Sequence, residues 1–98
     1  MNHSLLRVIH PGGPLQGSVD LPASKSISNR VLIIRRLCSP GFDVGNLSDA
    51  DDTITLLRLL QKAHSLEDAG AGGTTFRFLL ALRALQQHQG VLTGSARL

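Results

Sequence analysis

The sequence contains neither tryptophan nor tyrosine, and only three phenylalanines and one cysteine occur among its 98 residues. A single cysteine excludes an internal disulfide framework. The shortage of aromatic rings argues against a nucleic-acid surface on which bases stack. The four histidines and Cys38 show no spacing typical of a metal site, so we expect no metal ion.

Long apolar runs are also absent. The longest apolar stretch, residues 31–37, contains two arginines and is too short to cross a membrane. The first residues show no secretory signal pattern. We therefore expect a cytoplasmic protein with no membrane partner.

The charge balance is basic, with a net charge of +3 and a sequence pI near 10.0. Such a balance favours anionic partners, among them phosphorylated metabolites and nucleic acid. Nucleic acid is the weaker alternative, because the basic residues form no run. The length of 98 residues suits one small domain or part of a larger one.

Turn residues and apolar spacing predict the order β-β-α-β-α-(β)-α-β, which is an α+β or α/β layout. The first helix should begin at Ser24 or Ser26, and the second at Ser48 or Asp49. The glycine-rich residues 70–75 open the third helix, which runs to about residue 87. We expect strands at residues 5–10, 15–21, 42–47 and 90–94, and the connector 64–70 has room for another.

The apolar spacing also predicts the buried face of each helix. The third helix is apolar on opposite sides and should lie in the middle of a structure, so a chain that exposed it could self-associate. The predicted buried stripes are Ile27, Val31, Ile34 and Cys38 in the first helix, and Leu56, Leu59, Leu60 and Ala63 in the second.

Hydroxyls and cations gather where the first helix should begin, in SKSISNR, residues 24–30. The first turn of a helix has unpaired N–H groups and the positive end of the helix dipole. Ser26 and Arg30 share one face, and an Arg30 directed inward would require an anion. The segment therefore indicates either a phosphate or carboxylate site or a serine-capped helix with two solvated cations.

Two further segments could carry chemistry. In GAGGTTFR, residues 70–77, consecutive N–H groups before a helix could cradle an anion, and Arg77 needs a partner if that helix is buried. A flexible turn before a core helix is the alternative. In SDADDT, residues 48–53, the acids could bind a divalent cation, act as a general base or pair with the arginines, although helix capping alone explains them well.

Together these segments resemble the N-terminal part of the 5-enolpyruvylshikimate-3-phosphate synthase (3-phosphoshikimate 1-carboxyvinyltransferase) family. The segments LPASKSISNR, NLSDADDT, GAGGTTFRFLLAL and GVLTGSAR resemble four motifs of this family in the right order. The sister family of UDP-N-acetylglucosamine enolpyruvyl transferases carries a different lysine–asparagine motif at the first position. SKSISNR therefore argues against the sister family.

The resemblance implies a transferase of the shikimate pathway, which leads through chorismate to the aromatic amino acids. The family moves the enolpyruvyl group of phosphoenolpyruvate to the 5-hydroxyl of shikimate 3-phosphate and uses no organic cofactor. The residue match implies that Lys25 contacts both substrates, that Ser26 and Arg30 hold shikimate 3-phosphate, that Gly73 offers its backbone to phosphoenolpyruvate, and that Arg77 and Asp52 support the site.

The resemblance also implies two lobes built from βαβαββ units, with helices inside and sheets outside. Residues 1–22 would be a β segment of the first lobe, and residues 23–98 would begin the second lobe. The acid and lysine that transfer protons in the family have no counterpart here, so we expect the isolated chain to be inactive without its partner lobe. An inert anion-binding module and, less favoured, a small basic nucleic-acid binder are the alternatives.

Several residues depart from the family pattern. Ala71 stands where many members have asparagine, and Phe78 stands where proline is common. The connector 54–69 is shorter than in many members. These departures concern the side of the site that would hold phosphoenolpyruvate.

Overall fold

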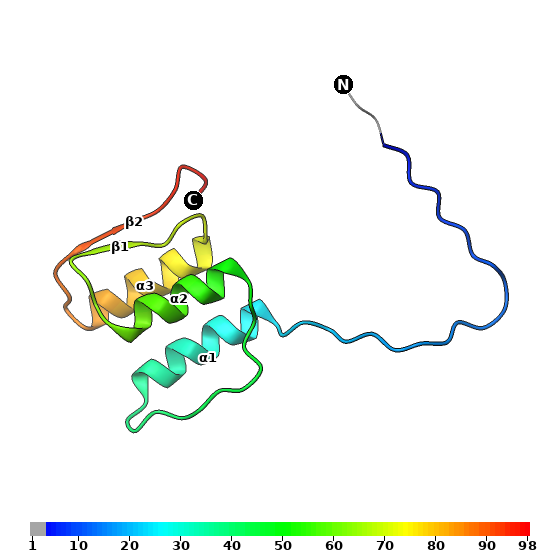
Figure 1. Cartoon of the computed structure of the whole chain (residues 1–98). Coiled ribbons are helices and arrows are strands. Elements are labelled where there is room, and N and C mark those ends of the chain that lie inside the picture. The colour runs from blue at the N-terminus through cyan, green and yellow to red at the C-terminus, as the bar shows by residue number, and fades with distance from the viewer. Residues whose placement is uncertain (1–3) are drawn as a thin grey trace.

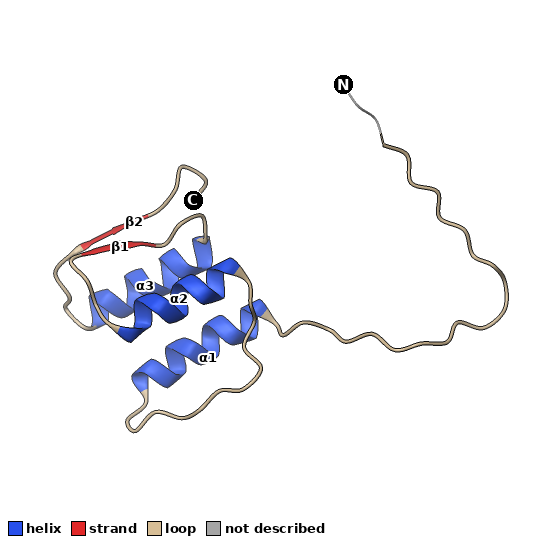
Figure 2. Cartoon of the chain, in the orientation of Figure 1, coloured by secondary structure: helices blue, strands red, loops and turns tan. Residues whose placement is uncertain are grey.

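The computed structural model describes residues 4–98 as an extended N-terminal segment followed by three helices and two short strands (Figure 2). The class is therefore mixed helix and sheet, as the sequence predicts. None of the helices in this part of the chain is long and apolar enough to span a membrane. The elements are α1 (Lys25–Leu37), α2 (Asp51–Gln61), β1 (Leu66–Asp68), α3 (Gly73–Leu85) and β2 (Val91–Thr93).

The three helices lie side by side and run in the same direction, so that their N-terminal ends lie at one end of the layer (Figure 1). Strands β1 and β2 pair in parallel, with Leu66 opposite Val91 and Asp68 opposite Thr93. A parallel pair needs a crossover connection, and α3 supplies it. The predicted strands at 64–70 and 90–94 are confirmed as β1 and β2.

The observed first residues of the helices agree only in part with those predicted from the sequence. The hydroxyl of Ser24 accepts a hydrogen bond from the Ile27 N–H at 3.1 Å, which confirms the predicted cap of α1. The N-cap of α2 is Ala50, so the prediction of Ser48 or Asp49 is wrong. The Ser48 hydroxyl instead accepts from the Ala50 N–H at 3.1 Å and shapes the turn before the helix.

The core is built from leucines of all three helices. Leu56, Leu59 and Leu60 are buried on α2 as predicted, whereas Ala63 is exposed because α2 ends at Gln61. On α3 only one apolar face is covered, so the prediction of a helix buried on opposite sides is wrong for this chain. The buried core residues are Leu32, Leu56, Leu59, Leu60, Leu79 and Leu82.

The buried face of α1 also differs from the predicted stripe. Ile27 and Ile34 are 64% and 52% exposed, whereas Ser28 and Asn29 are buried. The two polar side chains turn inward because they accept hydrogen bonds from α2 and from the loop before it. Apolar periodicity cannot detect a helix face that is buried through polar contacts.

Residues 4–22, here called the arm, are extended and contain no paired strand (Figure 1). The predicted strands at 5–10 and 15–21 are therefore wrong in this structure, and so is the strand at 42–47, which is a loop. A β-strand needs a neighbouring backbone for its hydrogen bonds, and no neighbouring strand lies beside either arm segment in the part of the chain that is described.

A buried ion pair ties β1 to α3. The Arg83 Nε and Nη2 groups donate to the two carboxylate oxygens of Glu67, both at 2.8 Å, and Nη2 also donates to the Leu59 carbonyl at 2.7 Å. The Arg83 Nη1 group donates to Gln86 Oε1 at 2.9 Å. Both charged side chains are less than a tenth exposed, and every donor nitrogen of Arg83 has a partner. This bidentate geometry joins the sheet, α3 and the end of α2.

Breaking this pair should destabilise the fold strongly. Arg83→Met should lower the free energy of unfolding by about 3–5 kcal/mol, because it leaves the Glu67 carboxylate buried without its partner. Urea denaturation followed by circular dichroism measures the change. The control is Arg36→Met on an exposed face of α1, and equal losses in the two variants would contradict this role.

The same pair should make stability depend on pH. Hydrogen bonds from Arg83 lower the pKa of Glu67 below its ordinary value of 4.5, with help from the charges of Arg83 and His88, while burial opposes the shift. The ionised form therefore stabilises the fold above about pH 4.5, and this contribution is lost as the pH falls through the lowered pKa. Glu67→Gln should flatten this part of the stability curve. Parallel curves for the variant and the unmodified chain would contradict the assignment.

Candidate functional site

The N-terminal ends of the three helices meet around the first turn of α2. Lys25, at the start of α1, places its Nζ 3.2 Å from Asp52 Oδ2. The Thr75 hydroxyl, in the first turn of α3, donates to the Asp52 carbonyl oxygen at 2.9 Å. Asp52 therefore contacts both neighbouring helices, and we call Lys25, Asp52 and Thr75 the helix-end cluster.

The glycine-rich loop approaches this cluster closely because it carries no side chain there. A Cβ atom on Gly72 would lie 3.0 Å from Asp52 Oδ1 and 3.1 Å from the Thr75 hydroxyl oxygen. Gly70 has a φ of +64°, a conformation that glycine adopts without strain. Gly73, the glycine singled out from the sequence, begins α3. The closest approach belongs to Gly72, which the sequence did not distinguish.

A second, buried set of polar contacts joins α1 to α2 just behind the cluster. The Thr53 hydroxyl donates to Asn29 Oδ1 at 2.8 Å, and the Ser48 N–H donates to the Ser28 hydroxyl at 2.9 Å. Sequence reasoning missed these residues as buried partners. The available signal was Ser28 and Asn29 within SKSISNR, because they lie at positions where an ordinary amphipathic helix carries apolar side chains.

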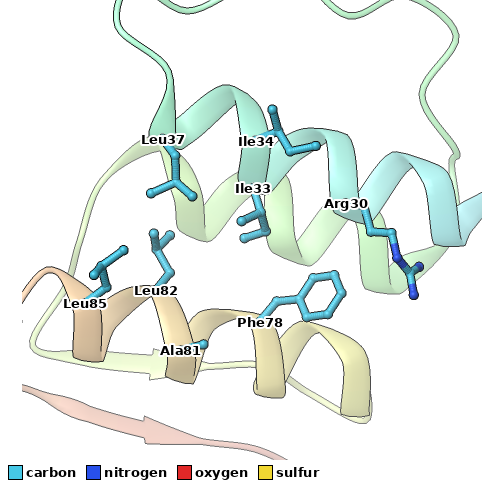
Figure 3. A pocket seen from close by; sticks show the side chains of 8 residues that line it. All are labelled: Arg30, Ile33, Ile34, Leu37, Phe78, Ala81, Leu82 and Leu85. Carbon is cyan, nitrogen blue, oxygen red and sulfur yellow. The ribbon is translucent and has the colours of Figure 1, made fainter.

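Of the two alternatives that the sequence left open for Arg30, the structure shows the solvated side chain and not one directed into the interior. It is exposed, and its Nη1 group donates to the Ser26 carbonyl one turn earlier at 3.0 Å. Its guanidinium lies 5.8 Å from the centre of the Phe78 ring of α3 (Figure 3). A cation at this distance interacts with the ring face, so Phe78 helps to orient Arg30.

Arg77 is also exposed, so it does not need the partner that a position on a buried helix would require. Its Nη2 group lies 3.4 Å from the Thr74 hydroxyl. Of the alternatives that the sequence left open for the α2 acids, pairing with the arginines does not apply to Asp52, which pairs with Lys25. In residues 4–98 no group of three or more histidines, cysteines and acids could hold a metal ion.

The charges at this end of the molecule favour an anion. Three helix dipoles present their positive ends together, and the first turns carry N–H groups without intrahelical partners. Lys25, Arg30 and Arg77 add positive charge, and the carboxylates of Asp51 and Asp52 in the first turn of α2 offset part of it. A phosphate or carboxylate suits such a site, because backbone N–H groups and cations can bind it together.

Comparison with known proteins identifies the family. The profile of the family described as EPSP synthase (3-phosphoshikimate 1-carboxyvinyltransferase) matches residues 9–68, more than half of the chain. The chain belongs to the EPSP synthase family. The matched region contains Lys25, Ser26, Arg30 and Asp52, whereas Gly73 and Arg77 lie beyond it.

Curated relatives agree with this assignment. A 3-phosphoshikimate 1-carboxyvinyltransferase of Bacteroides fragilis is 44% identical over 85 residues, which cover 86% of this chain and 20% of the relative. Enzymes of the same name from Hamiltonella defensa and Thiobacillus denitrificans are 34% and 39% identical, over 92% and 84% of this chain and 27% and 25% of the relatives. No solved structure matches the chain significantly.

The chain is thus much shorter than these relatives and spans about a fifth to a quarter of their length. The alignment with the Hamiltonella defensa enzyme extends over 116 residues, more than the whole of this chain. That relative therefore has residues with no counterpart here.

The contacts predict different structural costs for Lys25 and Thr53. Lys25→Ala should change the free energy of unfolding by less than about 1 kcal/mol, because the lysine side chain is 52% exposed and solvent weakens its ion pair. Thr53→Val should cost about 1–3 kcal/mol, because it leaves the buried Asn29 amide without its remaining partner. Chemical denaturation tests both variants. If Lys25→Ala lowered the free energy of unfolding by more than about 1 kcal/mol, the lysine would have a structural role.

Proposed function

We propose that this chain supplies part of the substrate site of an enzyme that transfers the enolpyruvyl group of phosphoenolpyruvate to the 5-hydroxyl of shikimate 3-phosphate. The observation that supports this most is the meeting of α1 and α3 at Asp52, since it brings the SKSISNR and GAGG segments together. Both substrates carry phosphate and carboxylate groups. These groups match the positive helix ends and the three exposed or half-exposed cations beside them.

In this proposal the first segment binds the sugar acid. Ser26 and Arg30 hold shikimate 3-phosphate, and the hydrogen bond from Arg30 to the Ser26 carbonyl keeps the two residues one turn apart on one helix. Lys25 contacts both substrates from its position at the start of α1. Its Nζ donates at 3.2 Å to Asp52, so two of its three protons remain for ligand oxygens.

The glycine-rich segment receives phosphoenolpyruvate. Gly73 offers its backbone N–H in the first turn of α3, where no intrahelical carbonyl is available to it. Arg77, one turn further along, braces this loop through Thr74. Asp52 supports both halves of the site, because its carboxylate orients Lys25 and its carbonyl binds Thr75. Ala71 supplies no polar side chain, so binding on this side depends on the backbone.

The same proposal accounts for the arrangement of the elements. The order α2–β1–α3–β2 with a parallel sheet is compatible with the alternating middle of a βαβαββ unit, although no strand separates α1 from α2 in residues 38–50. We assign residues 23–98 to the beginning of one lobe and residues 1–22 to the other. The unpaired arm supports this assignment, since a segment that belongs to another sheet has no partner here.

These residues bind and orient substrates, and none of them is assigned a proton-transfer step. We therefore expect the purified chain alone to release no phosphate from the two substrates. A free-standing anion-binding module would also bind the substrates without turnover. Steady turnover by the chain alone would contradict the proposed division of roles.

Alanine substitutions should separate the binding residues from other surface cations. Lys25→Ala and Arg30→Ala should each weaken the affinity for shikimate 3-phosphate roughly tenfold to a hundredfold, because each removes a charged hydrogen bond of about 1.5–3 kcal/mol. Isothermal titration calorimetry measures the affinity. Arg36→Ala, at the other end of α1, is the matched control and should leave it unchanged. Equal affinities in all three variants would contradict the assigned roles.

A further inference from the structure

Two contacts from two different helices hold the guanidinium of Arg30, although the side chain is exposed. Its Nη1 group donates to the Ser26 carbonyl of α1 at 3.0 Å. Its Cζ atom lies 5.8 Å from the centre of the Phe78 ring of α3. Each contact restricts the rotation of a long side chain that would otherwise sample many conformations. Arg30 is therefore partly ordered before any ligand binds.

The other arginine of the candidate site has no comparable second contact. The Arg77 Nη2 group lies 3.4 Å from the Thr74 hydroxyl, within one turn of the same helix. In residues 4–98 no lysine or arginine other than Arg30 lies over an aromatic ring. The contact with Phe78 thus distinguishes Arg30 from the other cations of the site.

Phe78 is itself held in place. It is partly buried and packs against the leucine core. It also lines an apolar groove of about 400 Å³ between α1 and α3, in which Arg30 is the only charged residue (Figure 3). Apolar neighbours keep water from one side of the contact, and a cation that is partly desolvated is attracted more strongly to a ring. Phe78 therefore offers Arg30 a fixed surface.

The two contacts leave most of the Arg30 donors free. A guanidinium has five N–H donors, and the Ser26 carbonyl accepts from one of them. The attraction to a ring face is electrostatic and requires no hydrogen-bond acceptor. Four donors therefore remain for ligand oxygens while the side chain stays oriented.

We propose that Phe78 is a positioning residue of the substrate site, which holds Arg30 in the orientation that binds shikimate 3-phosphate. This inference rests on the proposed function and adds a residue to which that function gives no role. A side chain that is ordered in the free protein lowers the entropy cost of binding. Loss of the ring should thus weaken the affinity although no direct ligand contact is removed.

Isothermal titration calorimetry of the full chain with shikimate 3-phosphate tests this role. Phe78→Leu removes the ring, keeps an apolar side chain in the groove, and should raise the dissociation constant about twofold to fivefold. Phe78→Tyr keeps a ring face and should retain the unmodified value. Phe76→Leu is the matched control, because Phe76 is also a partly buried phenylalanine of α3 but lines a different cavity, beside Glu67 and β2. It should leave the constant unchanged.

A double variant shows whether the effect passes through Arg30. In an Arg30→Ala chain, Phe78→Leu should weaken the affinity no further, because the residue that it positions is absent. Equal weakening with and without Arg30, or no weakening when Arg30 is present, would overturn the inference and leave the proposed function standing. If Arg30→Ala alone left the affinity unchanged, the proposed role of Arg30 would fail, and the role of Phe78 would fail with it.

An NMR measurement without ligand tests the contact itself. The ring current of Phe78 should displace the side-chain methylene signals of Arg30 from those of Arg36, an exposed arginine of the same helix. Phe78→Leu should remove this displacement, whereas Phe76→Leu should not. Arg30 signals that do not respond to Phe78→Leu would overturn the inference whatever the affinities are.

Discussion

The proposed site depends on one constraint: the three helices pack in parallel, so that the N-terminal ends of α1 and α3 lie beside the first turn of α2. It brings three positive helix ends together, and Asp52 fixes two of them, through its carboxylate to Lys25 and its carbonyl to Thr75. The buried contact between Thr53 and Asn29 holds α1 in place just behind them. Gathering like dipole ends is unfavourable by itself and becomes favourable when an anion lies among them. In the proposed site, the same packing therefore favours a negatively charged ligand.

The C-terminal ends of α2 and α3 are held by a different interaction, the buried pair of Arg83 and Glu67. Its bidentate hydrogen bonds and the contact with the Leu59 carbonyl join the sheet to α2 and α3. A buried pair offers little net stability over an apolar packing, but loss of one partner is costly. Its effect is therefore to fix how the sheet sits on the helices. The cluster and the ion pair hold α2 and α3 parallel from their two ends.

The sequence predicted the mixed class, all three helices, both observed strands and the cap at Ser24, because these follow from local spacing and turn chemistry. It misplaced what depends on partners. The stripe through Ile27 and Ile34 was wrong, since Ser28 and Asn29 are buried by polar contacts that come from more than 18 residues away. Arg83 was overlooked because its partner, Glu67, lies on a strand too short to show periodicity. The motifs indicated the candidate site, but the orientation of Arg30 toward Phe78 required coordinates.

The most direct test of the central claim is to map backbone amide shifts of the ¹⁵N-labelled chain during titration with shikimate 3-phosphate, with inorganic phosphate as the reference ligand. If the three helix ends form one anion site, amides in residues 25–28, 51–53 and 73–75 should shift together, saturate with one dissociation constant, and respond more strongly to the sugar acid. Shifts confined to a single helix end, or unequal saturation at the three ends, would contradict a shared site.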